Sequence, residues 1–402
     1  MHERQWEYNA GIWQYQAEWV RDSSMMAMAM LYCGLHEDAE KLLCHIIRDM
    51  TDEEGRTLVG GTYVEIENEQ FDQAGQLLNT LYEFYLWTGN DRFIREDWCR
   101  IEALANRLNH LHCRDEGTKL FHNKREFWER NEWHGVERGY ELAYQVWPVL
   151  GLRAANQMAV IQGSEQALAL GRIWHASTDT QWDAVLNHPL YAFIRDGKWV
   201  KRIKMDGEVQ EIIKPVKDYK EKDDIPLGNE PISYLNPDAS VVFPIIYGLV
   251  SPDERTVLAT LEDLEQLWNM RWNHGGYDRY HTSSEPDTPG PWIFASLFLA
   301  RANHAAGRLE HSRKVLEWLN RIQGGTSGAW HEYIPVNEAN TYRNGILIWD
   351  WAEIILFLVR DVLGVRPGEK GLQAEPKLFP GMGRVSLKIP YQGKDIQINW
   401  TN

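Results

Sequence analysis

The sequence predicts an all-α protein in which helices pair as antiparallel hairpins and the hairpins close into an α/α toroid. Apolar residues recur at helical spacing through most of the chain, and the links between these segments alternate between short turns and long loops. The long loops contain clusters of glycine, tryptophan, tyrosine and acidic residues, whereas the short turns are plain. Because like-placed links share one face of such an array, we expect one face to carry the functional loops. An open helical solenoid is the alternative, but no fixed sequence period supports it.

The first hairpin is predicted over residues 17–33 and 37–50, which only the Gly34-Leu35-His36 turn separates. Its second helix carries apolar residues between Ala39 and Met50 at the spacing that marks one buried helix face. The same reasoning predicts further helices over residues 71–87, 92–112, 139–160, 165–176, 253–272, 291–306, 309–321 and 346–363. Short turns are expected around Gly34, Gly89, Gly163 and Gly307.

Two segments depart from this helical pattern. Residues 193–225 alternate apolar and charged side chains, which predicts a β-hairpin around Asp206-Gly207 followed by a charged loop. A second strand pair is predicted around Gln392-Gly393. Neither segment is long enough to form a domain, so we expect a helical domain over residues 1–367, with the first β segment inserted in it, and a short β extension over residues 368–402.

The composition narrows the function. Lys plus Arg is 42 and Asp plus Glu is 58, so the net charge is 42 − 58 = −16, which argues against nucleic acid or an anionic membrane as the partner. Nineteen Trp and 17 Tyr stand against 11 Phe, and this excess favours a wet, aromatic-lined cleft over the alternative of a Trp-rich core. No run is long enough to span a membrane and no signal region opens the chain, so a cytoplasmic protein is expected unless an upstream segment is missing.

No metal or other cofactor is expected. The 14 histidines form no HExxH motif or H-x-H pair, and no cysteine pair has CxxC spacing. We interpret all four cysteines as structural thiols: Cys33, Cys44, Cys99 and Cys113. Catalytic-triad, phosphate-binding and dinucleotide-binding motifs are also absent from the sequence.

Two acid-bearing segments precede predicted helices. In Trp19-Val20-Arg21-Asp22 the carboxylate could accept from two sugar hydroxyls while the guanidinium donates, although Asp22 could instead simply cap the helix. The segment 128–141 carries four carboxylates, and two tryptophans flank them. An acid against an indole is desolvated, which raises its pKa and suits it to donate a proton. A solvated surface loop is the alternative.

Three more segments add candidate residues. Glycines precede Glu332, which lies between aromatic residues and is the strongest local candidate for a catalytic carboxylate. Residues 271–292 mix aromatics, acids and amides, as recognition of a polyhydroxylated ligand requires, and a smaller cluster contains Asp72. Two carboxylates on one cleft, one protonated and one ionised, are the machinery of glycoside hydrolysis. The alternatives are a polysaccharide lyase, a carbohydrate-binding protein without catalysis, and a sugar epimerase that would use His134, His274 or His331.

Three motifs resemble glycoside hydrolase family 15, the glucoamylase-like enzymes, over about residues 10–367. They are Trp19-Val20-Arg21-Asp22, Glu285-Pro286-Asp287 followed by Gly-Pro-Trp, and Gly328-Ala329-Trp330-His331-Glu332. The bacterial glucoamylase and glucodextranase branch is the most similar. The resemblance implies an (α/α)6 barrel and inverting hydrolysis of α-glucosidic bonds from the non-reducing end, with no cofactor and an oligosaccharide or glycoside as the partner.

The resemblance also implies roles for single residues. Glu332 matches the general base, and Glu132, placed by counting back from Tyr140, matches the general acid, with Glu129 and Glu137 as alternatives. Their carboxyls should lie roughly 6.5–9.5 Å apart in an inverting enzyme. The expected substrate contacts are Trp19, Arg21, Asp22, Asp72, Trp128, Trp133, Trp272, Tyr277, Glu285, Asp287, Trp292 and Trp330.

The sequence departs from the family pattern at two points. Tyr333 follows the base where fungal glucoamylases have Gln, and the amino-terminal β-sandwich of many bacterial members is absent. A Glu-x-Tyr pattern is closer to related (α/α)6 hydrolases, so trehalase-like, rhamnosidase-like and debranching activities stay open beside the glucoamylase-like one.

Overall fold

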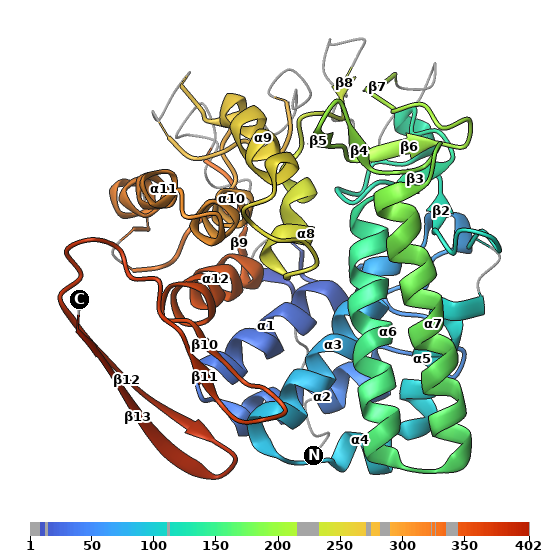
Figure 1. The fold of residues 1–402 in the computed structure, drawn as a ribbon, viewed down its shortest axis with the longest axis horizontal. Coiled ribbons are helices and arrows are strands. Elements are labelled where there is room, and N and C mark those ends of the chain that lie inside the picture. The colour runs from blue at the N-terminus through green and yellow to red at the C-terminus, as the bar shows by residue number, and fades with distance from the viewer. Residues whose placement is uncertain are drawn as a thin grey trace.

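The computed structural model of the chain is predominantly helical, with several small sheets at its edges (Figure 1). It describes residues 9–12, 15–110, 113–214, 233–270, 275–281, 290–322, 324–325, 327–334 and 345–401. Buried apolar side chains from all the long helices form one main core. Within the described part of the chain, no helix combines the length and the apolar character needed to cross a bilayer.

The first hairpins follow the prediction closely. They comprise α1 (Val20–Tyr32), α2 (His36–Asp49), α3 (Phe71–Thr88), α4 (Arg92–Glu96) and α5 (Trp98–His110). The face of α2 that the sequence marks as apolar is the buried one, since Ala39 and Ile46 are fully covered. The helix predicted over residues 92–112 is divided at Asp97, which ends α4. The Asp97 carboxylate accepts hydrogen bonds from the guanidinium of Arg48.

The next hairpin consists of α6 (Ala143–Gln162) and α7 (Glu165–Asn187), joined at Gly163 with a φ of 80°. Helix α3 crosses α6 at two glycines, because a Cβ on Gly75 would lie 2.3 Å from the carbonyl oxygen of Trp147 and one on Gly151 would lie 2.5 Å from the Cα of Gly75. Helix α7 runs past the predicted end at residue 176. Its last turns are rich in small polar residues, but they still bury Trp182 and Val185.

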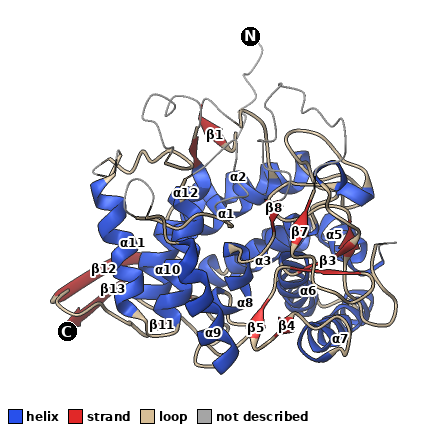
Figure 2. Ribbon diagram, turned by 90° about the horizontal axis from the view of Figure 1, so that it is seen from above, coloured by secondary structure: helices blue, strands red, loops and turns tan. Residues whose placement is uncertain are grey.

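The second half of the body contains α8 (Phe243–Ile246), α9 (Arg255–Asp263), α10 (Ile293–Ala305), α11 (Leu309–Arg321) and α12 (Ile348–Ile355). Helix α9 continues as a 3-10 turn over Leu264–Leu267, so the helix predicted to residue 272 ends earlier. Helix α12 continues as a π-helix over Leu356–Val362. Successive contacts link α1 to α3, α3 to α6, α6 to α8, α8 to α10, α10 to α12 and α12 back to α1 (Figure 2).

The first β segment is more extensive than predicted. Strands β4 (Ile194–Arg195) and β5 (Lys198–Trp199) form one hairpin, and β6 (Arg202–Lys204) turns back at Gly207 as expected. Strand β6 also pairs with β3 (Gly139–Glu141), which pairs with β2 (His122–Asn123). The helix predicted from residue 139 therefore begins only at Ala143. Strands β7 (Ile212–Ile213) and β8 (Ser233–Tyr234) pair, and residues 215–225 of the predicted charged loop lie outside the described residues.

Short strands also join distant parts of the sequence. Strand β1 (Gly11–Ile12) pairs with β9 (Ile346–Leu347) immediately before α12. Strands β10 (Val365–Arg366) and β11 (Gln373–Ala374) form a small hairpin. The predicted strand pair around Gln392-Gly393 is confirmed as β12 (Arg384–Tyr391) and β13 (Lys394–Thr401), a ribbon along one side of the body in Figure 1.

Candidate active site

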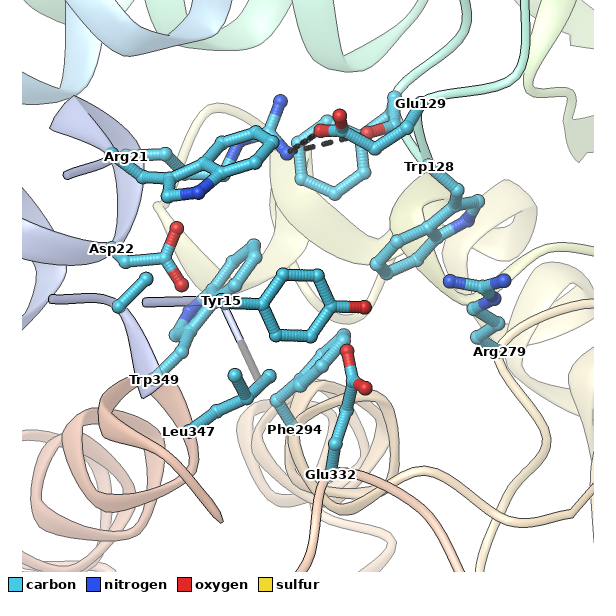
Figure 3. A pocket seen from close by; sticks show the side chains of 13 residues that line it. Tyr15, Arg21, Asp22, Trp128, Glu129, Arg279, Phe294, Glu332, Leu347 and Trp349 are labelled. Atoms are coloured by element: carbon cyan, nitrogen blue, oxygen red, sulfur yellow. Dashed lines mark hydrogen bonds and ion pairs between the residues drawn. The ribbon is translucent and has the colours of Figure 1, made fainter. Parts of the chain in front are cut away.

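One pocket collects side chains from both halves of the sequence (Figure 3). They come from long links or from the first turns of α1, α10 and α12. The lining residues are Ala10, Tyr15, Trp19, Arg21, Asp22, Phe127, Trp128, Glu129, Arg279, Phe294, Glu332, Leu347 and Trp349. The pocket therefore lies where the sequence placed the functional loops.

The start of α1 supplies three predicted residues to this pocket. Trp19 is the N-cap and makes no side-chain cap hydrogen bond, and Asp22 lies inside the first turn. Asp22 therefore does not act as the cap. Its carboxyl is 7% exposed, and burial raises its pKa to about 7 against the opposing effect of Arg21. At neutral pH this carboxyl can hold a proton while facing the cavity.

Arg21 is fixed from behind by Asp72. The Nε of Arg21 donates to Oδ2 of Asp72 at 2.7 Å and its second terminal nitrogen donates to Oδ1 at 3.0 Å. This fork geometry constrains the guanidinium more strongly than a single contact would. Asp72 is fully buried and does not line the pocket. Asp72, predicted as a direct substrate contact, therefore lies behind Arg21.

Glu129 reaches the pocket from the turn between α5 and α6. Its Oε1 accepts from Arg21 at 3.2 Å and from the Gln70 amide at 2.6 Å, and its Oε2 accepts from Arg125 at 2.6 Å. The backbone φ of Glu129 is 80°, a strained value for a residue with a side chain. Such a conformation persists where the surroundings over-determine it, and it is frequent at functional sites.

Glu332 lies across the cavity in a different environment. It is 4% exposed, and its backbone is tied to the start of α10, since the amide of Ile293 donates to the Glu332 carbonyl at 3.0 Å. The hydroxyl of Tyr15 donates to the Glu332 carboxylate, and the two side chains lie near each other in Figure 3. Burial, and then the negative charge of Glu332, hold the pKa of Tyr15 well above its ordinary value. Tyr15 is therefore a neutral donor beside this carboxylate.

Aromatic rings form much of the remaining wall. The ring of Phe294 stacks on Trp349 with centroids 4.9 Å apart and on Trp128 with centroids 5.6 Å apart. The Arg279 guanidinium lies 3.9 Å from the ring centroid of Trp292. Trp292 thus supports Arg279 from behind and does not line the pocket. Flat apolar faces beside charged groups suit the C–H surfaces and hydroxyls of a sugar.

Other predicted residues lie elsewhere. Glu132 is in a 3-10 turn, where it accepts from Lys124 at 2.7 Å with its side chain 40% exposed. Trp133 is 51% exposed and Glu137 is also exposed. The buried Tyr277 donates to Glu265, and Trp330 is buried without lining the cavity. His134 and His331 are not among the lining residues, and Trp272, His274, Glu285 and Asp287 lie outside the described residues.

Several lining residues were not predicted from the sequence, namely Ala10, Tyr15, Phe127, Phe294, Leu347 and Trp349, and Arg279 was included only as part of the segment 271–292. Phe294 and Trp349 are second residues of helices, like Arg21 in α1. The first turn after a long link was therefore the available signal. Within the described residues, no cluster of three His, Cys, Asp or Glu side chains is arranged to hold a metal ion.

Comparisons with known proteins relate this fold to glycosidases. No protein-family model matches the sequence. An alignment over 123 residues with Trehalase 1 of Sulfolobus acidocaldarius is 25% identical, and it covers 23% of this chain and 22% of that protein.

Solved structures match over most of the chain. A wild-type glycosidase is 17% identical, with 89% of this chain and 91% of that chain covered and a TM-score of 0.59. A bacterial glucoamylase complexed with acarbose is 16% identical over 86% of this chain and 49% of its own, with a TM-score of 0.61. A GH78 family rhamnosidase of Bacillus sp. GL1 is 18% identical over 96% and 36%, also with a TM-score of 0.61. The chain therefore shares its overall fold with these glycosidases.

Proposed function

We propose that this protein is a glycoside hydrolase that works with a pair of carboxyl groups, Glu129 as general acid and Glu332 as general base. The observation that carries the proposal is that two carboxylates from distant loops line one aromatic pocket that also contains Arg21 and Asp22. Paired carboxyl groups flanking the scissile bond are the usual machinery of glycoside hydrolysis. The ring of contacts from α1 round to α12 supports the predicted (α/α)6 toroid as the scaffold.

Glu129 replaces Glu132 as the first choice of acid. Of the three candidates in its segment, Glu129 alone lines the pocket, whereas Glu132 is paired with Lys124 and Glu137 is exposed. In the proposed reaction Glu129 gives a proton to the leaving oxygen, and its own charge is then stabilised by Arg21 and Arg125. Those guanidiniums favour the state that forms as the bond breaks.

Asp22 is the second candidate for the acid. Burial raises its pKa to about 7, so it carries a proton below about pH 7, as a general acid must. In the first assignment Asp22 instead binds hydroxyls of the terminal sugar together with Arg21. A substrate whose leaving group needs no proton shows which of Glu129 and Asp22 is the acid. Replacing the acid should slow its cleavage much less than that of a substrate with an alcohol leaving group.

Glu332 is proposed to activate the attacking water. It is nearly fully buried, lines the cavity and has the Tyr15 hydroxyl beside its carboxylate, so it faces the space where the attacking water would lie. If the two carboxyls lie roughly 6.5–9.5 Å apart, water fits between Glu332 and the anomeric carbon and the configuration inverts. Trp19, Trp128 and Trp349 would contact the sugar faces, which suits removal of a terminal residue.

The proposed substrate is an α-glucoside, with trehalose-type and rhamnoside substrates as alternatives. The test is proton NMR of sugar released from maltotriose, isomaltotriose, trehalose and an α-rhamnoside, with Glu332→Gln as the control protein. Early appearance of β-glucose from an α-linked substrate supports inversion. Early α-glucose contradicts the inverting mechanism, and binding without release by the wild-type protein supports the non-catalytic alternative.

A further inference from the structure

A buried group of charged residues lies behind Trp128 and outside the pocket. We define the Lys201 cluster as Glu126, Glu141, Lys201, Arg202 and Asp238, all of which are fully buried. None of them lines the pocket. Buried charges are expensive to desolvate and need close partners, so this arrangement calls for an explanation that the proposed reaction does not supply.

Lys201 is the central cation of this cluster. Its Nζ lies 2.6 Å from Oδ2 of Asp238 and 3.8 Å from Oε1 of Glu141, and it also donates to the Glu126 carboxylate. Its backbone is fixed as well, because the amide donates to the side chain of Asn236 at 3.1 Å. The residue belongs to the inserted β segment, between strands β5 and β6.

Glu126 begins the turn that carries Glu129. Its amide donates to the carbonyl of Arg130 at 2.9 Å, and its carbonyl accepts from the amide of Glu129 at 3.1 Å. Its carboxylate also accepts from the amide of Arg130 at 2.9 Å. Burial opposes ionisation of Glu126, but the positive charges of Lys201 and of Arg130, whose Nε donates to the same carboxylate at 3.1 Å, together outweigh it and hold the pKa of Glu126 below its ordinary value.

Asp238 connects the same lysine to the neighbouring pocket residue. The indole Nε1 of Trp128 donates to Oδ2 of Asp238 at 2.8 Å and to Oδ1 at 3.0 Å. Lys201 also lies 5.7 Å from the centre of the Trp128 ring. One buried cation therefore contacts both the carboxylate that closes the turn and the carboxylate that orients its indole.

We propose that Lys201 is a positioning residue that holds the turn over residues 126–130, and with it Trp128 and Glu129, in the orientation needed for proton donation. The role rests on the proposed glycosidase function. Without Lys201, Glu126 and Asp238 would be buried carboxylates that repel one another, and the strained backbone of Glu129 would lose its support from behind. In this proposal the β segment over residues 193–225 contributes to the site, because its Lys201 holds the turn that carries Glu129.

The first experiment compares Lys201→Met with wild type on two substrates of the same sugar, one with an alcohol leaving group and one a glycosyl fluoride. Fluoride leaves without a proton, so misplacing the acid affects it least. We expect kcat on the alcohol-leaving substrate to fall about 100-fold, as for a displaced catalytic group, and kcat on the fluoride to fall far less. Equal losses on both substrates would overturn the proposal.

Two further variants separate positioning from loss of stability. Arg114→Met removes another buried cation, one whose guanidinium binds Gln181, Asn109 and two backbone carbonyls, and it should affect the two substrates equally. Asp238→Asn keeps an acceptor for the Trp128 indole and removes one charge, so it should show a smaller loss with the same substrate preference. This variant also decides the question if Lys201→Met does not fold, and equal losses with it would count against the proposal.

Hydrogen–deuterium exchange tests the positioning independently of any activity. In Lys201→Met the amides over residues 126–130 should exchange faster, while those of α1 and of residues 327–334 should be unchanged. Unchanged exchange over residues 126–130 would overturn the proposal even in an active enzyme. Conversely, if the wild-type protein hydrolyses no glycoside, the proposed function fails while the exchange result still decides whether Lys201 holds the turn.

Discussion

The turn over residues 126–130 and the loop over residues 327–334 each bring one carboxylate to the pocket, but they do so in different electrostatic surroundings. Glu129 is contacted by two arginines and an amide, and Lys201 lies behind its turn. Glu332 is nearly fully buried, is tied through its backbone to the start of α10, and accepts from Tyr15. The comparison teaches that charged partners fix the group proposed to donate, whereas burial and a backbone hydrogen bond hold the group proposed to activate water.

The largest effect is expected for Glu332→Gln. Removal of a general base costs about 10²–10⁴-fold in rate, and no other carboxylate in the same loop can replace it. The initial rate of sugar release is the measurement, with circular dichroism as the check on folding. A folded variant that keeps a tenth of the wild-type rate contradicts the role of Glu332.

Glu129→Gln should have the next largest effect, and it should depend on the leaving group. We expect about 10²-fold or more lost on a substrate with an alcohol leaving group, because no proton can be donated, and a small loss on the glycosyl fluoride. Rates on both substrates are measured side by side with Asp22→Asn. If Asp22→Asn shows this selectivity and Glu129→Gln does not, the acid is Asp22.

Asp72→Asn tests the charged surroundings of Glu129, because Asp72 binds Arg21 from outside the pocket. It leaves Arg21 with one neutral acceptor in place of a two-point ion pair, and a hydrogen bond to a charged group contributes about 1.5–3 kcal/mol. We expect kcat/KM to fall about 10- to 100-fold. Steady-state kinetics provide the measurement, and an unchanged kcat/KM would show that Arg21 does not depend on Asp72.

Tyr15→Phe tests the surroundings of Glu332. It removes the hydroxyl that donates to Glu332 and keeps the ring in the wall. Because a typical hydrogen bond contributes about 1 kcal/mol, we expect a fall of about fivefold in kcat/KM. A loss as large as that of Glu332→Gln would instead mean that the hydroxyl contacts the reacting atoms.

The smallest effect concerns stability and pH. Burial raises the pKa of Asp22 from 3.8 to about 7, so between these values the folded protein keeps a proton that the unfolded chain releases. The contribution of this group to stability is therefore full below about pH 4 and declines as the pH rises through 7. Thermal unfolding at about pH 4 and pH 7 should show a smaller pH effect in Asp22→Asn than in wild type. An equal pH effect in both would contradict the raised pKa.

Much of the helical body could be predicted from spacing alone, because apolar faces such as that of α2 are the faces that pack inward. The acid was harder to place. Counting back from Tyr140 assumes that a helix begins there, but Gly139–Glu141 is strand β3, which pairs with the inserted β6. Pairing between residues so distant in the sequence leaves no local pattern.

The environment of Glu129 was also beyond a local prediction. The turn that gives it a positive φ is closed by Glu126, and the Glu126 carboxylate contacts Lys201, 75 residues further along the sequence. Tyr15 was missed for a related reason, since its partner Glu332 lies in a loop near the other end of the helical body. By contrast, Trp19, Arg21 and Asp22, which line the pocket, could be predicted together because they are adjacent in the sequence and share one helix start.

The pairing of β1 with β9 has a consequence for biosynthesis. Tyr15, Arg21 and Asp22 leave the ribosome early, yet the strand that fastens their segment and the loop that holds Glu332 are made only after α11. Until Ile346–Leu347 has been synthesised, the wall that carries Tyr15 has no partner strand. The pocket is therefore completed only near the end of translation of the helical body, and a nascent chain interrupted before Glu332 carries half of the proposed catalytic pair.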